Sequence, residues 1–125
     1  MSDFLRSLLT AEAHSDPYVW AAVALAHAMI GASLMIFAGL LAAALMGDPV
    51  AGLVLVAAGY AVWEVMQTLG GGGVLDAGLD WLMVMLGASI VVTIWRRRLG
   101  EAAAAVALMF SIIFGGVLRR VRGRP

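Results

Sequence analysis

The residues best suited to chemistry lie in the middle of a long apolar sequence. Glu64 is preceded by Tyr60 and followed by Gln67. Spacings of four and three residues place these three side chains on one face of a helix. Glu64 precedes Gly70 by six residues, about 9 Å along a helix, so its carboxylate is expected well inside the apolar segment. Ionisable groups in such a position are costly and indicate a functional site.

A second pair of carboxylates follows the four consecutive glycines at 70–73. Asp76 and Asp80 are four residues apart and share one helical face, which Gly87 continues. A glycine at that position lets a neighbouring helix approach closely. Because the glycine run makes a tight turn between two antiparallel helices, both aspartates are expected at the same end of the bundle as Glu64.

A histidine completes this group of polar residues. His27 lies ten residues after Pro17, which is about 15 Å into the first apolar segment. That segment starts on the side where the second ends and the third begins. The sequence therefore predicts that His27 lies in the same half of the membrane as the carboxylates.

This group of residues suits two kinds of chemistry. Several carboxylates in a low dielectric require protons or a cation to offset their charge. A histidine beside them can form an acid–base pair or proton relay, and the same donors suit a cation. Candidate catalytic residues are Glu64 and Asp80, as acid–base or cation-holding groups, and His27 as their proton partner. Candidate ligand-binding residues are Gln67, Asp76 and Tyr60.

Each polar residue also has a structural explanation. Asp76 after a glycine loop can be a helix N-cap, and His27 can make a hydrogen bond between helices. Gln67 can lie at the membrane interface. Glu64 is the hardest to explain in this way because of its depth. No cofactor and no metal is assigned, and the absence of cysteine excludes thiolate metal sites.

The composition specifies the class of fold that must position these residues. Hydrophobic residues make up 63% of the 125 residues and charged residues 13%, against roughly 45–50% and 25% in soluble domains. Mean hydropathy is +0.99. A soluble domain of this size cannot hide so much apolar surface. The sequence therefore predicts an all-α integral membrane bundle.

Three to four transmembrane helices are expected within a bundle covering residues 16–118. Asp16 and Pro17 can begin the first, and the sequence Gly47-Asp48-Pro49 can end it and begin the second. The last segment, at seventeen residues, is at the lower limit for crossing. The expected spans are about 18–46, 50–69, 74–95 and, if the fourth crosses, 102–118.

The two ends of the chain are expected to differ in character. Residues 1–15 have the pattern of an interfacial amphipathic helix, and residues 119–125 form a basic tail. Seven of the eight arginines follow position 95, and lysine is absent. This pattern is typical of residues that orient a membrane protein, not of a nucleic-acid surface. With three spans both arginine groups lie on one side. With four spans they lie on opposite sides. The two sides then carry similar positive charge, so the positive-inside rule gives little indication of the orientation.

The order His27, Glu64-x-x-Gln67, Asp76, Asp80 resembles the VanZ-like family of small membrane proteins, over roughly residues 27–87. The sequence departs from the family where residues 70–73 replace a loop arginine and where residues 83–86 lack an asparagine. The resemblance implies a multi-pass protein of the bacterial inner (cytoplasmic) membrane. It also implies a role at the cell envelope, with the polar residues on the extracytoplasmic side.

We therefore expect a protein that binds or processes a lipid-linked or amphipathic envelope ligand. If it is an enzyme, hydrolysis or transfer on a lipid headgroup fits the residues. The alternatives are a phage holin-type pore, in which Glu64 and Asp80 face a seam or lumen, and a small structural subunit of a membrane complex. The expected partners are membrane lipids, with a homo-oligomer or a larger complex as further options, and no nucleic acid.

Overall fold

The computed structural model describes residues 15–123, and every described element is helical. The predicted interfacial helix over residues 1–15 falls almost wholly outside this range. The predicted all-α bundle is confirmed for the described residues, which contain no strand. The elements are α2 (Pro17–Met46), the 3₁₀ turn η1 (Pro49–Ala51), α3 (Gly52–Leu69), α4 (Val74–Trp95) and α5 (Leu99–Arg122).

Four helices are long and apolar enough to cross a membrane. The fourth, α5, has 24 residues, or about 36 Å at 1.5 Å per residue, against a hydrocarbon core of about 30 Å. It is longer than the predicted 102–118 because its polar ends continue the helix on both sides. The four hydrophobic helices expected from the sequence are therefore present, and the fourth is long enough to cross; that it crosses fully stays a prediction.

The helix ends follow from local side-chain chemistry. The Asp16 carboxylate accepts hydrogen bonds from two backbone N–H groups in the first turn of α2, and Pro17 occupies the first helical position. Gly47 ends α2 with a φ of 73°, a left-handed conformation that suits glycine. Asp48 then accepts a hydrogen bond of 2.9 Å from the Val50 N–H and begins the next segment. These ends agree with the sequence prediction.

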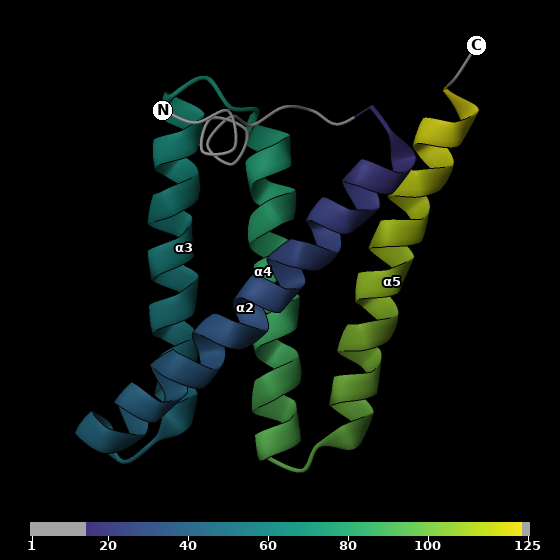
Figure 1. The fold of residues 1–125 in the computed structure, drawn as a ribbon. Coiled ribbons are helices and arrows are strands. Elements are labelled where there is room, and N and C mark those ends of the chain that lie inside the picture. Colours follow the sequence, from purple (N-terminus) through teal and green to yellow (C-terminus); the bar gives the residue numbers. More distant parts are fainter. Residues whose placement is uncertain (1–14, 124–125) are drawn as a thin grey trace.

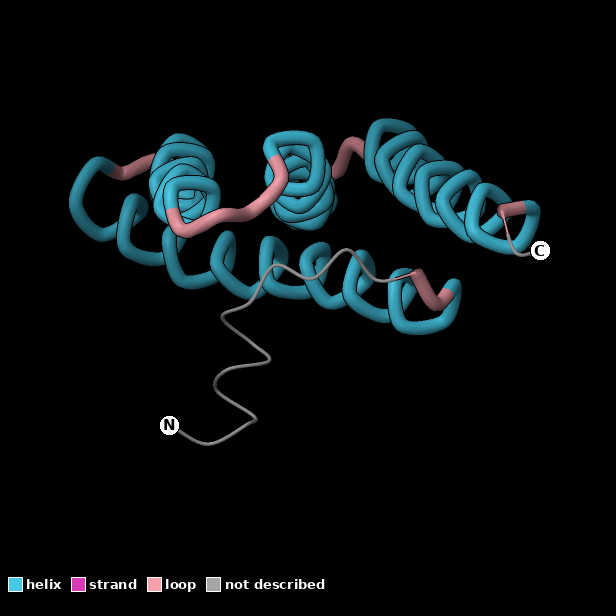
Figure 2. The backbone as a smooth tube through the Cα atoms, turned by 90° about the horizontal axis from the view of Figure 1, so that it is seen from above, coloured by secondary structure: helices cyan, strands magenta, loops and turns pink. Residues whose placement is uncertain are grey.

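Three of the helices form a layer and the fourth crosses it. In Figures 1 and 2, α3, α4 and α5 lie side by side, with α4 in the middle, and α2 runs diagonally over one face. The start of α2, the α3–α4 turn and the end of α5 lie at one end of the bundle (Figure 1). The α2–α3 and α4–α5 connections lie at the other end.

Small residues let α2 pack closely on α4. A β-carbon built at Gly31 would overlap the backbone of Val84, and one built at Gly87 would overlap the backbone of Ala28. The close approach predicted at Gly87 is therefore present. Two apolar clusters surround this crossing. The fully buried side chains Met83 and Met35 each belong to one of them.

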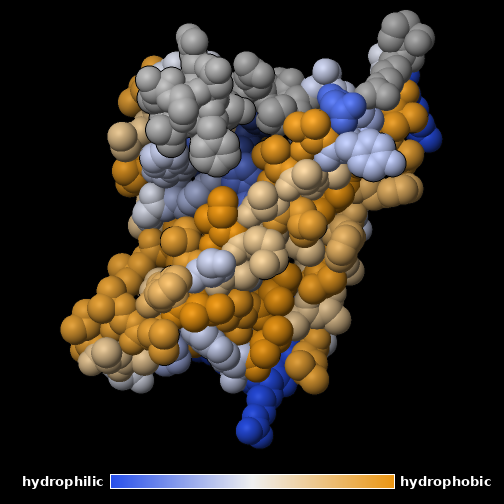
Figure 3. Space-filling model, in the orientation of Figure 1, coloured by the Kyte–Doolittle hydropathy of each residue, from blue (hydrophilic) through white to orange (hydrophobic). Residues whose placement is uncertain are grey.

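The outer surface is apolar over most of the face seen in Figure 3. Large side chains such as Phe37 and Leu75 are 72% and 91% exposed. Hydrophilic atoms gather in the upper part of this face, between α3 and α2 (Figure 3). The bundle thus has a lipid-compatible exterior and a polar region near the end that carries the α3–α4 turn.

Candidate functional site

Three helices bring His27, Glu64 and Asp80 together. One donor atom from each side chain lies within 4.8 Å of the donor atoms of the other two. His27 comes from α2, Glu64 from α3 and Asp80 from α4. We call these three residues the polar cluster. They are the three residues that the sequence singled out as candidate catalytic residues.

His27 and Asp80 form the link between α2 and α4. The His27 Nδ1 atom lies 3.5 Å from Asp80 Oδ1 and 2.8 Å from the backbone carbonyl oxygen of Val23. A carbonyl oxygen only accepts hydrogen bonds, so Nδ1 carries the proton. In neutral His27 the Nε2 atom therefore keeps its lone pair, which is available to a ligand.

Glu64 is the most deeply buried member of the cluster. Its exposed fraction is 7%, and it is the only buried charged residue within residues 15–123. The Tyr60 hydroxyl interacts with the Glu64 carboxylate. The Tyr60 ring also meets the His27 ring edge-on, with centroids 6.2 Å apart. Tyr60 therefore contacts two cluster members, in agreement with its predicted place beside Glu64.

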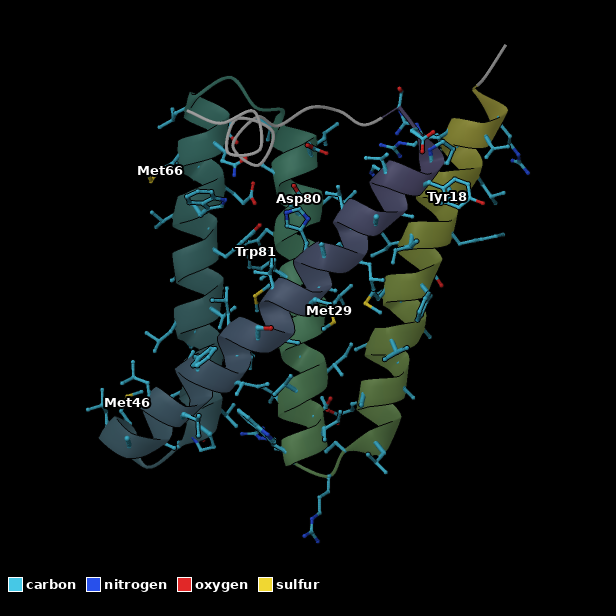
Figure 4. All side chains as sticks on the ribbon, viewed as in Figure 1. Tyr18, Met29, Met46, Met66, Asp80 and Trp81 are labelled. Carbon is cyan, nitrogen blue, oxygen red and sulfur yellow. The ribbon has the colours of Figure 1, made fainter. Side chains whose placement is uncertain are left out.

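The residue after Asp80 joins α4 to α3. The Trp81 indole N–H donates a hydrogen bond of 3.0 Å to the backbone carbonyl oxygen of Ala57. Figure 4 places Asp80 and Trp81 in the upper half of α4, near the α2 crossing. Trp81 was missed in the sequence analysis. The sequence does contain a signal for Trp81: an indole N–H inside an apolar helix needs a hydrogen-bond acceptor nearby.

The remaining predicted residues are Asp76, which is not one of the three cluster residues, and Gln67. Asp76 is in the first turn of α4, but Gly73 occupies the N-cap position and makes no side-chain cap. The interpretation of Asp76 as an N-cap is therefore wrong, because the helix begins earlier than that role requires. Its charge acts on both Glu64 and Asp80. Gln67 is half-buried, and its backbone carbonyl accepts a hydrogen bond from Gly72 in the turn.

An open groove of about 360 Å³ runs between α3 and α4 and reaches the polar cluster. Glu64 is the only ionisable residue in its lining, and no residue of α2 contributes. The groove was not predicted, because it depends on how two helices pack. The lining residues are Ala61, Glu64, Val65, Thr68, Leu69, Val74, Ala77, Gly78 and Trp81.

Arginines flank the bundle at both ends. Near the end that carries the cluster, the Arg120 guanidinium lies over the Trp20 ring of α2, 4.4 Å from its centroid. At the opposite end, Arg98 forms an ion pair of 3.0 Å with Glu101. The two arginine groups thus lie at opposite ends, as expected for four spans.

The fold and the site define a four-helix integral membrane protein with a polar cluster in its interior. Comparisons with protein-family models, with curated proteins and with solved structures find no match to this chain. The VanZ-like resemblance stays a prediction. The functional argument therefore depends on the geometry of the cluster and the groove.

Proposed function

We propose that this chain is a multi-pass protein of the bacterial cytoplasmic membrane that binds a lipid-linked or amphipathic ligand of the cell envelope. One observation supports this most strongly: Glu64 belongs both to the polar cluster and to the lining of the α3–α4 groove. The polar headgroup of the ligand meets the cluster, and its apolar part lies in the groove.

The groove suits an apolar chain that arrives from the bilayer. Its volume of about 360 Å³ is within the range of about 300–1,000 Å³ for small-molecule sites. Ala61, Ala77 and Gly78 contribute small side chains to the lining, while Val74 and Leu69 are exposed at its edge. A ligand can therefore reach Glu64 from the side, without leaving an apolar environment.

The cluster provides groups for chemistry on the headgroup. Glu64 and Asp80 are placed to hold a cation or to exchange protons, with His27 as the proton partner. Hydrolysis or transfer at the headgroup is the reaction that these groups serve, if the ligand is processed. A neutral His27 with a free Nε2 lone pair is suited to accept the proton.

The burial of Glu64 favours this proposal over the holin-type pore. A pore requires Glu64 and Asp80 at a seam or lumen between copies, but Glu64 is only 7% exposed within a single chain. Expression in bacteria separates the two. Sustained growth with an intact membrane potential is expected, and abrupt arrest with loss of potential would favour the pore.

Ligand capture provides the direct test. The protein is purified in mild detergent, and the amphiphiles that remain bound are identified by mass spectrometry. Gly78→Leu fills the groove, and a β-carbon at Gly78 has no neighbour within 4 Å, so the fold is expected to persist. Gly59→Leu is the matched control, since Gly59 has equal space and lies outside the groove.

The wild type and Gly59→Leu should retain a specific amphiphile that Gly78→Leu has lost. Retention by Gly78→Leu at the wild-type level would contradict the proposal, as would a wild type carrying only bulk lipid. Glu64→Gln should alter which headgroups are retained. The exposed residue Glu101, changed to Gln, should have no effect.

A further inference from the structure

We infer that His27, Glu64 and Asp80 form a binding site for one divalent transition-metal ion. The three side chains come from three different helices, and their donor atoms lie within 4.8 Å of one another. The site is thus assembled by the fold and is not a run of neighbouring acidic residues. The inference goes beyond the proposed function, because the ion can be held whether or not an amphiphile binds.

The spacing of the donors is close to that of a metal site. Nitrogen and carboxylate oxygen bind such ions at about 2.0–2.2 Å, so donors at tetrahedral angles on one ion lie about 3.3–3.6 Å apart. The limit of 4.8 Å between the cluster atoms exceeds this separation by at most about 1.2–1.5 Å. Rotation of the three side chains closes this difference when the ion binds.

His27 is already held in the manner of a metal-binding histidine. Such histidines usually donate the second ring N–H to a carbonyl or carboxylate, which fixes the tautomer and the ring orientation. The Val23 carbonyl oxygen serves this role at 2.8 Å from Nδ1. Nδ1, which also lies 3.5 Å from Asp80 Oδ1, keeps its proton, so Nε2 is the nitrogen whose lone pair would bind the ion.

The charge of the cluster points independently to a cation. Glu64 is more than nine-tenths buried. The described charged groups that act on it are His27, Asp76 and Asp80, and no arginine is among them. A buried Glu64 carboxylate beside the part-buried Asp80 carboxylate, without a permanently charged basic partner, is expensive in an apolar interior. A divalent ion offsets both negative charges of Glu64 and Asp80.

The donor set also indicates the class of ion. One imidazole with two carboxylates suits Zn²⁺, Mn²⁺ or Fe²⁺, whereas Mg²⁺ and Ca²⁺ prefer sites made only of oxygen. Three protein ligands leave at least one position open for water or for an oxygen atom of a ligand. An ion so placed can polarise a headgroup oxygen or activate a bound water.

A metal-binding titration tests this inference. The 125-residue chain is purified without a histidine tag, and bound metal is removed with a chelator. Titration with Co²⁺ is followed by its visible absorption, and Zn²⁺ is then added as a competitor. We expect one Co²⁺ per chain, displaced by Zn²⁺. Glu64→Gln, Asp80→Asn and His27→Gln should each weaken binding by about 10-fold or more, and Glu101→Gln should leave it unchanged.

A second measurement covers the case of a variant that folds poorly. Zn²⁺ should raise the unfolding midpoint of the wild type and of Glu101→Gln, and it should have no such effect on a helical Glu64→Gln protein. A wild type that binds well below one ion per chain would overturn the inference. Binding of Co²⁺ by Glu64→Gln or Asp80→Asn with the affinity of the wild type would also overturn the inference.

The metal inference and the ligand proposal can fail separately. Gly78 is not a donor, so Gly78→Leu should bind Co²⁺ as the wild type does while losing the amphiphile. Loss of both in Gly78→Leu would contradict the separation of the metal site from the groove. Metal binding without any specific amphiphile would contradict the ligand proposal alone.

Discussion

Gly87 of α4 lies directly against the backbone of Ala28 in α2, where any β-carbon would overlap the Ala28 carbonyl. Ala28 is the neighbour of His27, so this contact holds His27 at the level of α4 where Asp80 lies 3.5 Å away. The polar cluster therefore depends on an apolar contact between two helices. Residues outside the cluster can be used to test how it is assembled.

Gly87→Ala should destabilise the bundle and weaken the polar cluster. The added methyl group must push α2 from α4, and overpacking of this kind costs typically about 1–3 kcal/mol. Unfolding in mixed micelles with increasing dodecyl sulfate, followed by circular dichroism, measures the change. Gly78→Ala is the control, because its β-carbon meets nothing within 4 Å. Equal stability of the two variants would show that the close contact is absent.

Trp81→Phe should lower stability by about 0.6–1.7 kcal/mol, the size of a hydrogen bond between membrane helices. The change removes the indole N–H that donates to the Ala57 carbonyl oxygen and keeps an aromatic ring beside the groove. The same unfolding assay applies. Trp63→Phe is the matched control, since Trp63 is 41% exposed on α3 and should tolerate the change. A loss of stability in Trp63→Phe as large as in Trp81→Phe would count against this account.

Arg120→Gln should loosen the end of α5. The Arg120 guanidinium lies over the Trp20 ring at 4.4 Å from its centroid, and such contacts are worth about 0.5–1 kcal/mol at exposed sites. Arg120→Lys should lose less, because a lysine keeps the charge. The exposed Arg122, changed to Gln, is the control. The prediction fails if Arg122→Gln lowers the unfolding midpoint as much as Arg120→Gln.

Four spans predict which loops share a side of the membrane. The chain has no cysteine, so single cysteines can be labelled with an impermeant maleimide on intact cells and on opened membranes. Gly72→Cys and Gly123→Cys should react from the same side, and Leu99→Cys from the other. Labelling of Gly72→Cys and Gly123→Cys from opposite sides would rule out the described arrangement.

Much of the fold could be predicted from local chemistry. Asp16 and Gly47 act on neighbouring residues only, so the ends of α2 were readable from the sequence. The sequence prediction made α5 too short, because it assigned the arginines after residue 118 to a tail. Three of these arginines belong to the last turn of the helix. The sequence allowed Asp76 to be either a helix N-cap or a site residue. The structure excludes the N-cap role, because Gly73 occupies the N-cap position.

The polar cluster was predictable in outline and not in detail. Helical spacing and topology placed His27, Glu64 and Asp80 in one half of the membrane. Which of the polar residues meet depends on the diagonal crossing of α2, and that crossing is set by contacts between distant residues such as Gly31 and Val84. The groove beside Glu64 also depends on how two helices pack, so no local sequence pattern predicts it.

The convergence of three helices on one site is the central claim, and cysteine cross-linking in native membranes tests it most directly. His27→Cys is combined with Asp80→Cys or Glu64→Cys and oxidised with copper phenanthroline. The controls pair His27→Cys with Gly78→Cys or Val65→Cys, which lie in the groove lining. Fast intramolecular cross-linking of the cluster pairs, with little in the controls, is the predicted result. Equal rates in all four pairs, or no cross-link at the cluster, would contradict the account.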